Sequence, residues 1–185
     1  MKIQDSELRL LPHQDLKPAS LARLKPAAVL LPLYEAEGMD WLVFTRRSPH
    51  LRQHSGQISF PGGKFDAEDG HLAWTALRES WEEIGLPPAE VTLLGSLPPM
   101  ETISDYLLYP IVGRFDGPLD LKVNPTEIDE IICVPLAHLA DPAFQRREQR
   151  HYRGREHLIH YFDYPPHTIW GITGQILADF LARLP

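Results

Sequence analysis

The chain has 185 residues, 43% of them hydrophobic, which is enough for one domain with an ordinary apolar core. Its formal net charge of -7 has the same sign as nucleic acid and anionic membranes, so broad electrostatic binding to either is excluded. We expect a single domain over residues 1–185 with a small-molecule substrate. A polyanionic substrate would need local arginines or metal ions.

The cysteine content and the N-terminal segment indicate the compartment. Cys133 is the single cysteine, so no intrachain disulfide forms, and its apolar neighbours in "IICVPL" favour a buried strand thiol over a nucleophile. The segment "MKIQDSELRLLPHQDLKP" mixes both charges, and no apolar run approaches the length of a membrane span. We therefore expect neither signal peptide nor anchor, and a cytoplasmic location.

The first elements along the chain are strands. The runs "AAVLLPLY" (27–34) and "DWLVFTRRS" (40–48) are apolar and β-rich, and the polar segment between them contains Gly38, which predicts a hairpin or two adjacent strands. The next run, "GQISFPGGK" (56–64), predicts a short strand that enters a glycine turn.

From about His71 to Ile84 the spacing of apolar residues predicts a helix. Asp66 or Asp69 can cap its start, and Gly85 suits a left-handed terminal position. The expected packing face consists of Leu72, Ala73, Ala76, Leu77, Ser80, Trp81 and Ile84.

Strands outnumber helices in the remainder of the chain. The segments 91–99, 107–115 and 130–136 predict strands, 136–144 predicts a short helix, and 155–164 predicts one strand or a pair. An amphipathic helix is expected from 171 to 184, starting after Trp170. Helices scattered among strands favour an α/β class with a mixed sheet covered by helices.

Three glutamates cluster on the helix that ends at Ile84. Glu79, Glu82 and Glu83 have i, i+3 and i+4 spacing and fall within an arc of roughly 100°. Like charges at this spacing weaken a helix, and Arg78 can neutralise only one of them through its i, i+4 contact with Glu82. A solvated helix face is one explanation, and a site for Mg²⁺ or Mn²⁺ is the other. The glycine turn just before the helix favours the metal site.

Together these residues resemble the signature of the Nudix hydrolase family. Gly63 opens the motif, and Arg78, Glu79, Glu82, Glu83, Gly85 and Leu86 close it. The sequence departs from the family pattern at two places. Asp69 stands at the first acidic position, with eight rather than seven residues between it and Arg78, and Ser80 is polar where an apolar residue is usual. The resemblance therefore does not assign Asp69 as a metal ligand.

The segment "VFTRRSPHLRQHSGQISFPGGK" (Val43 to Lys64) resembles the signature of the coenzyme A pyrophosphatase branch of the family, as do the lengthened motif and "WGITGQIL" (Trp170 to Leu177). The resemblance implies a Nudix-type α/β/α sandwich with a mixed β-sheet between helices. It implies metal-dependent hydrolysis of coenzyme A or its thioesters to 3′,5′-ADP and 4′-phosphopantetheine or its acylated form.

The resemblance also implies roles for individual residues. Glu79 and Glu83 become the principal metal ligands, with Glu82 as an additional ligand or water-orienting base. Gly63 contributes a backbone carbonyl, and Arg78 orients a glutamate. Either Mg²⁺ or Mn²⁺ satisfies such a ligand set.

The general base and the phosphate-binding residues are less defined. Glu127 can serve as the base if it reaches the metal centre, and a surface acid on a turn is the alternative. Arg46, Arg47 and Arg52 can bind substrate phosphates, of which we favour Arg46. His50 and His54 have the spacing of a zinc pair but lie between Pro49 and Gly56, so we expect a loop without zinc.

Two rival functions share these features. One is a Nudix pyrophosphatase acting on ADP-ribose, dinucleotides or nucleoside triphosphates. The other is an inactive Nudix module that binds nucleotides, but such a module would be expected to lack a metal glutamate. The sequence leaves open the acyl preference, the physiological role and the oligomeric state, including a homodimer.

Overall fold

The two apolar runs near the N-terminus pair as an antiparallel hairpin in the computed structural model, as predicted. Strand β1 (Lys25–Ala36) turns into β2 (Met39–Arg47) through Glu37 and Gly38, whose φ angles are 55° and 73°. Two left-handed residues form the tight turn whose twist matches that of the flanking strands. The structure describes residues 1–13, 16–18, 23–50, 55–117, 120–152 and 154–185.

The main sheet is mixed. Strand β1 runs parallel to β7 (Tyr106–Phe115), and the other pairings described in this sheet are antiparallel. Its order is β3-β2-β1-β7-β5, with β4 beside β1, β6 beside β7 and β8 beside β2. The remaining strands are β3 (Ile58–Ser59), β4 (Gly62–Lys64), β5 (Val91–Ser96), β6 (Met100–Glu101) and β8 (Ile128–Pro135).

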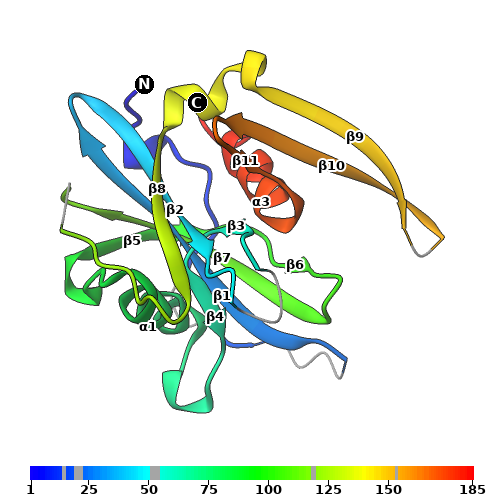
Figure 1. The fold of residues 1–185 in the computed structure, drawn as a ribbon. Helices are drawn as coiled ribbons and strands as arrows, with labels where there is room; N and C mark the ends of the chain where they lie inside the picture. The colour runs from blue at the N-terminus through cyan, green and yellow to red at the C-terminus, as the bar shows by residue number, and fades with distance from the viewer. Residues whose placement is uncertain (14–15, 19–22, 51–54, 118–119, 153) are drawn as a thin grey trace.

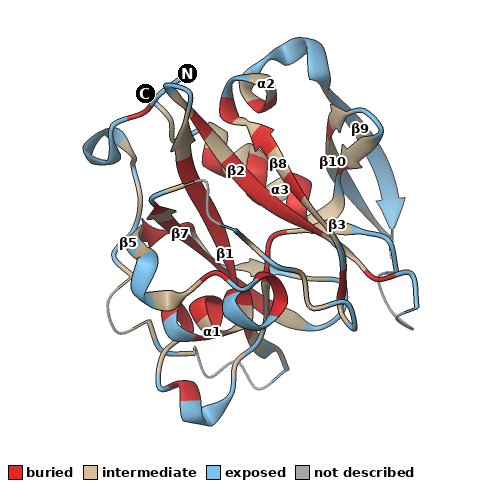
Figure 2. Ribbon diagram, turned by 60° about the vertical axis from the view of Figure 1, so that its left-hand side comes forward, coloured by how far each residue is buried: buried red, intermediate tan, exposed pale blue. Residues whose placement is uncertain are grey.

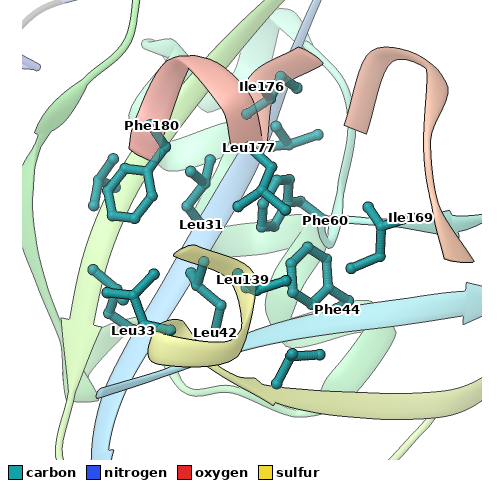
Figure 3. Close-up of a cluster of buried hydrophobic side chains, with 14 of the residues drawn as sticks. Leu31, Leu33, Leu42, Phe44, Phe60, Leu139, Ile169, Ile176, Leu177 and Phe180 are labelled. Carbon is teal, nitrogen blue, oxygen red and sulfur yellow. The ribbon is translucent and has the colours of Figure 1, made fainter. Parts of the chain in front are cut away.

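Helices cover both faces of this sheet, so the architecture is an α/β/α sandwich. Helix α1 (Leu72–Ile84) packs on one face and α3 (Gly171–Leu181) on the other (Figure 1). Side chains of β1 alternate between the two layers, because successive residues of a strand point to opposite faces. Leu30 joins the apolar cluster under α1, and Leu31 joins the cluster under α3 (Figure 3).

A second sheet contains a strand that the sequence did not predict. Strands β9 (Gln145–Tyr152), β10 (Arg155–Tyr164) and β11 (His167–Ile169) are antiparallel, in the order β11-β10-β9. The side chains of β9 are polar and mostly exposed (Figure 2), so no alternation of apolar residues marks it. Its backbone pairing with β10 makes it a strand.

The two sheets share one apolar cluster. Phe162 of β10 and Ile169 of β11 belong to the same buried cluster as Leu31, Phe44 and residues of α3. The short helix α2 (Leu136–Ala140) contributes to this cluster and continues into a 3-10 turn at Pro142–Phe144, which matches the helix predicted over 136–144. Other 3-10 turns are Asp5–Glu7, Ala67–Asp69 and Pro88–Glu90.

Helix α1 has the predicted extent but a different first cap and a smaller packing face. His71 is the N-cap, and its side chain accepts a hydrogen bond from the Trp74 backbone N–H, so neither aspartate has that role. Gly85 ends the helix with a φ of 68°, as predicted. Trp81 was assigned to the packing face, but its side chain is 54% exposed.

The burial of Cys133 and the lengths of the helices bear on two expectations from the sequence. Cys133 lies on β8 and is half-buried, and burial raises the pKa of its thiol, as expected for a packed cysteine. Within the described residues, the helices are all too short or too polar to span a bilayer.

Candidate active site

The glycine turn lies directly against α1. Strand β4 pairs with β1, with Gly63 opposite Ala28 and Gly62 opposite Val29. A Cβ atom on Gly62 would overlap the Ala28 carbonyl oxygen, and one on Gly63 would overlap the Glu79 carboxylate. Gly62 therefore needs glycine, because a side chain there would push the turn away from the backbone of β1, whereas a side chain on Gly63 would displace the carboxylate of Glu79.

Glu83 is the most buried acid of the site, with 2% of its surface exposed. Its Oε2 accepts a hydrogen bond from the Gly62 N–H at 3.1 Å, and its Oε1 lies 3.6 Å from Arg47 Nη1. Burial raises the pKa of the carboxyl to about 8; Gly62 and Arg47 oppose this shift, and the charges of Glu79 and Glu127 add to it. The helical spacing places Glu83 on the same face of the helix as Glu79 and Glu82. The turn and Arg47 nevertheless cover it.

Glu79 lies beside Gly63, and its carboxylate is near the negative charges of Glu82 and Glu127. Burial raises the pKa of its carboxyl, and the charges of Glu82 and Glu127 raise it further, while Arg78 acts in the opposite direction. The charge of Glu127 thus acts on both Glu79 and Glu83, and the charge of Glu79 acts on Glu83.

Glu127 reaches this region because its loop is attached to the end of α1. The Asn124 N–H donates to the Glu83 carbonyl oxygen at 2.8 Å, and the Lys122 N–H donates to the Ile84 carbonyl oxygen at 3.0 Å. The Ser48 N–H donates to the carbonyl oxygen of Glu127 itself at 2.8 Å. These bonds hold the segment before β8 over the carboxylates of α1.

Arg78 is held by Asp69, a role that sequence reasoning did not identify. Arg78 Nε and Nη2 donate to the two oxygens of Asp69 at 2.7 and 3.0 Å, and Arg78 Nη1 lies 3.0 Å from Glu79 Oε1 and 3.3 Å from Glu82 Oε2. Burial alone would raise the pKa of Asp69, but its hydrogen bonds from Arg78, Asp66 and Thr75 lower it overall. The bond to Asp69 is the main cause of the raised pKa of Arg78.

The extra residue between Asp69 and Arg78 has a structural explanation. Asp69 ends a separate 3-10 turn, Ala67–Asp69, in which Asp66 and Asp69 bond to each other's backbone N–H groups. The periodicity of α1 therefore gives no signal for this contact. The position of Asp69 in the motif was the available clue.

The acids fit a hard divalent cation by their chemistry. Carboxylate oxygens are the donors that Mg²⁺ and Mn²⁺ prefer. Burial, and to a lesser degree neighbouring carboxylates, raise the pKa of Glu79 and Glu83, and a bound cation would favour their charged forms. Across the described residues, no three His, Cys, Asp or Glu side chains are gathered in a ligating arrangement. Arg47 and Arg78 lie against Glu83 and Glu79, so ion binding would require these side chains to rearrange.

The three candidate phosphate-binding arginines have different surroundings. Arg47 faces α1 through Glu83, whereas Arg46, one residue earlier on β2, pairs with Asp129 and Glu130 at 2.6 and 3.1 Å. The pairing of β2 with β8 is irregular at this point, as at many functional sites. Arg52 lies outside the described residues, as does His54.

Arg46 also lines a pocket of about 430 Å³ next to the second sheet. Its other lining residues come from the segment around β3 and from the segment that leads into α3, and include Gln57, Ile58, His167, Thr168 and Trp170. Trp170 is 47% exposed, so it forms a pocket wall and is not a core residue. The pocket has a size typical of small-ligand sites.

Comparison with known proteins identifies the family. The model of the NUDIX domain matches residues 23–161, more than half of the chain. The chain belongs to the Nudix family. It is 40% identical over 158 residues to the uncharacterized Nudix hydrolase NudL of Photorhabdus laumondii, covering 85% of this chain and 84% of that protein. The protein is therefore a Nudix hydrolase, and such enzymes generally use divalent metal ions.

Solved structures resemble this Nudix hydrolase in fold. A Nudix hydrolase from M. smegmatis, RenU, has a TM-score of 0.54 and 22% identity, covering 63% of this chain and 73% of that one. A C. elegans Ap4A hydrolase has a TM-score of 0.52 and 17% identity, covering 60% and 80%. At these identities the likeness concerns the α/β/α architecture.

Proposed function

We propose that this Nudix hydrolase cleaves the pyrophosphate of coenzyme A or its thioesters. Water attacks one phosphorus atom, the bridging P–O bond breaks, and the products are 3′,5′-ADP and 4′-phosphopantetheine or its acylated form. The observation that carries the proposal is the position of the segment Val43 to Lys64. This segment contributes Arg47 beside Glu83, Gly63 beside Glu79, and Arg46 in the adjacent pocket.

Glu79 and Glu83 are the proposed principal metal ligands, with Glu82 and the Gly63 carbonyl as further donors. A divalent ion held there would lower the pKa of a bound water and neutralise charge on the phosphoryl oxygens. Either Mg²⁺ or Mn²⁺ suits these oxygen donors.

The surrounding side chains have positioning and proton-transfer roles in this proposal. Arg78, anchored by Asp69, orients Glu79 and Glu82. Glu127 is the proposed general base, since its charge is felt by both Glu79 and Glu83. Glu82 is the alternative base, with a half-exposed carboxylate that solvent can reach.

Arginines would bind the substrate phosphates outside the reacting bond. Arg46 borders the 430 Å³ pocket and would donate hydrogen bonds to the 3′-phosphate that distinguishes coenzyme A. To do so it would give up some of its ion-pair contacts with Asp129 and Glu130. Arg47 lies nearer the reacting phosphates through its contact with Glu83. Arg52 remains a proposed phosphate ligand of the same segment.

Product analysis tests the substrate. Purified protein is incubated with coenzyme A, ADP-ribose, a dinucleotide and a nucleoside triphosphate, each with Mg²⁺, with Mn²⁺ or with chelator, and the products are separated by chromatography. We expect metal-dependent 3′,5′-ADP and phosphopantetheine at a rate well above that of the other substrates. Faster cleavage of another substrate would replace coenzyme A in the proposal and leave the metal site intact.

A further inference from the structure

A second pocket lies on the other side of Trp170. The β9–β10 hairpin projects away from the main sheet, and the β6–β7 connection lies on the same side of the molecule (Figure 1). Side chains from these two parts, together with Trp170, line an open pocket of about 440 Å³. Its lining is mainly aliphatic and aromatic, with Arg150 and His157 of the hairpin as the polar members: Ile103, Arg150, Tyr152, His157, Ile159, Tyr161 and Trp170.

The apolar side chains of this pocket are open to solvent. Ile103 is 66% exposed, and Tyr152 and Trp170 are exposed by 44% and 47%. Contiguous exposed apolar surface is unusual on a soluble domain and marks a place where something apolar binds. A surface that served only to fold the chain would not leave large aromatic rings uncovered.

Trp170, which lies between the two pockets, is held in place by stacking contacts. Trp170 stacks on Tyr161 with ring centroids 6.2 Å apart, and the Arg146 guanidinium lies 3.8 Å from the centre of the Tyr161 ring. Arg146 is in turn paired with Glu148 and Asp163. These contacts limit the movement of Tyr161 and Trp170, so the apolar pocket exists without a ligand.

The apolar pocket borders the pocket of the proposed substrate site at Trp170. This residue lines both pockets, and the polar one contains Arg46, whose neighbour Arg47 contacts Glu83. A substrate with charged phosphates at one end and an apolar group at the other would meet matching surroundings along this path. Free coenzyme A ends in a thiol and would leave the apolar pocket mostly unfilled.

We propose that the apolar pocket beside the β9–β10 hairpin binds the acyl chain of an acyl-coenzyme A substrate. This inference rests on the proposed function and narrows its substrate class to medium-chain aliphatic thioesters. Each methylene that enters the pocket should raise kcat/KM by roughly two- to four-fold until the pocket is filled. The gain belongs to binding of a remote part of the substrate, and no new chemical step is required.

The test compares coenzyme A with its acetyl, butyryl, hexanoyl and octanoyl thioesters. For the wild-type protein we expect kcat/KM to rise along this series. In Ile103→Asp, a carboxylate enters the apolar pocket, so the preference for octanoyl-coenzyme A over coenzyme A should fall by about tenfold or more. The rate with coenzyme A itself should stay within about twofold.

Leu158→Asp is the matched control. Leu158 is another exposed large apolar residue, 47% exposed, and it lies next to Ile159 on β10 but outside the pocket lining. Successive strand residues point to opposite faces, so this change adds the same charge on the other side of the hairpin. We expect the chain-length preference of the wild type, and both exposed substitutions should leave the thermal unfolding temperature nearly unchanged.

The outcomes separate the inference from the function on which it rests. Hydrolysis of coenzyme A with equal rates along the acyl series would overturn the acyl pocket and leave the proposed function standing. Equal losses on coenzyme A and octanoyl-coenzyme A in Ile103→Asp would overturn it too. A change of oligomeric mass in Ile103→Asp would assign the surface to contacts between copies. Failure to cleave every one of these thioesters and coenzyme A would reject the proposed function and the inference with it.

Discussion

At the scale of single residues, the burial and the neighbours of each carboxylate set how easily it ionises. Glu83 is enclosed by the glycine turn and Arg47, Glu79 lies against Gly63, and Glu82 remains half-exposed beside Arg78. Three acids of one motif thus have three different environments. The buried pair is the one that would gain most from a cation.

Glu83→Gln tests the assignment of the buried ligand. The change removes a charge with little change in volume, so turnover should fall by about a hundredfold or more while the folded structure persists. Steady-state kinetics with saturating Mg²⁺ and circular dichroism measure the two effects. Glu90→Gln, an exposed acid on the turn after α1, is the control and should retain activity. Full turnover in Glu83→Gln would remove this residue from the metal centre.

The raised pKa of Glu83 predicts a pH dependence of stability in the absence of metal. Its pKa in the folded chain is about 8, against an ordinary value of 4.5, so between these pH values the folded chain holds a proton that the unfolded chain releases. The free energy of unfolding should therefore decrease as pH rises through this window. Urea unfolding at pH 5 and pH 9 with chelator measures this, and Glu83→Gln should show a smaller decrease. Equal pH dependence in both proteins would contradict the shift.

At the scale of elements, β4 and α1 define the site by their close approach. Strand β4 has three residues, two of them glycine, and its pairing with β1 sets the position of its backbone over the α1 carboxylates. The second contribution comes from the loop before β8, which is bonded to the C-terminal end of α1 and carries Glu127. The sequence separates these elements by tens of residues.

Gly63→Ala should disturb this approach. Its new Cβ would overlap the Glu79 carboxylate, so the flexible end of the Glu79 side chain must turn away from β4, which should lower the free energy of unfolding by under about 1 kcal/mol. We expect activity to fall by about tenfold or more. Lys64→Ala changes the next side chain of β4, which is exposed, and should alter neither property much. Denaturant unfolding and steady-state kinetics of both variants measure these effects on stability and activity. A fully active Gly63→Ala protein would argue against close packing of the turn on Glu79.

At the scale of the whole molecule, α3 joins the two sheets. Its apolar residues Ile176, Leu177 and Phe180 are buried in a cluster that includes Phe44 of the main sheet and Ile169 of the second sheet (Figure 3). This packing places Trp170, the residue before α3, between the two pockets. The position of the second sheet relative to Glu79 and Glu83 thus depends on the core of α3.

Phe180→Ala should lower the stability of the molecule as a unit. Removing a fully buried ring costs about 3–5 kcal/mol in proteins, and the loss here affects contacts of both sheets. We expect a single unfolding transition at a clearly lower temperature by calorimetry. Leu158→Ala removes an exposed side chain and should change the unfolding free energy by under about 1 kcal/mol. A Phe180→Ala protein as stable as the wild type would contradict the shared core.

The sequence by itself determined what local patterns encode. Runs of apolar, β-prone residues predicted β1 and β2, helical spacing predicted α1 and α3, and the spacing from Gly63 to Leu86 identified the family. These features depend on the composition and the period of side chains along one element, so they can be read from the chain directly. Strand β9 was missed for the same reason, because its exposed polar side chains carry no period.

Only the tertiary structure decided which groups meet. It buried Glu83, left Trp81 exposed, anchored Arg78 to Asp69, and placed Arg46 and Arg47 on different sides of β2. It also set Trp170 between a polar and an apolar pocket. Burial and charge at each of these positions come from segments distant in the chain, and local periodicity carries no information about such neighbours.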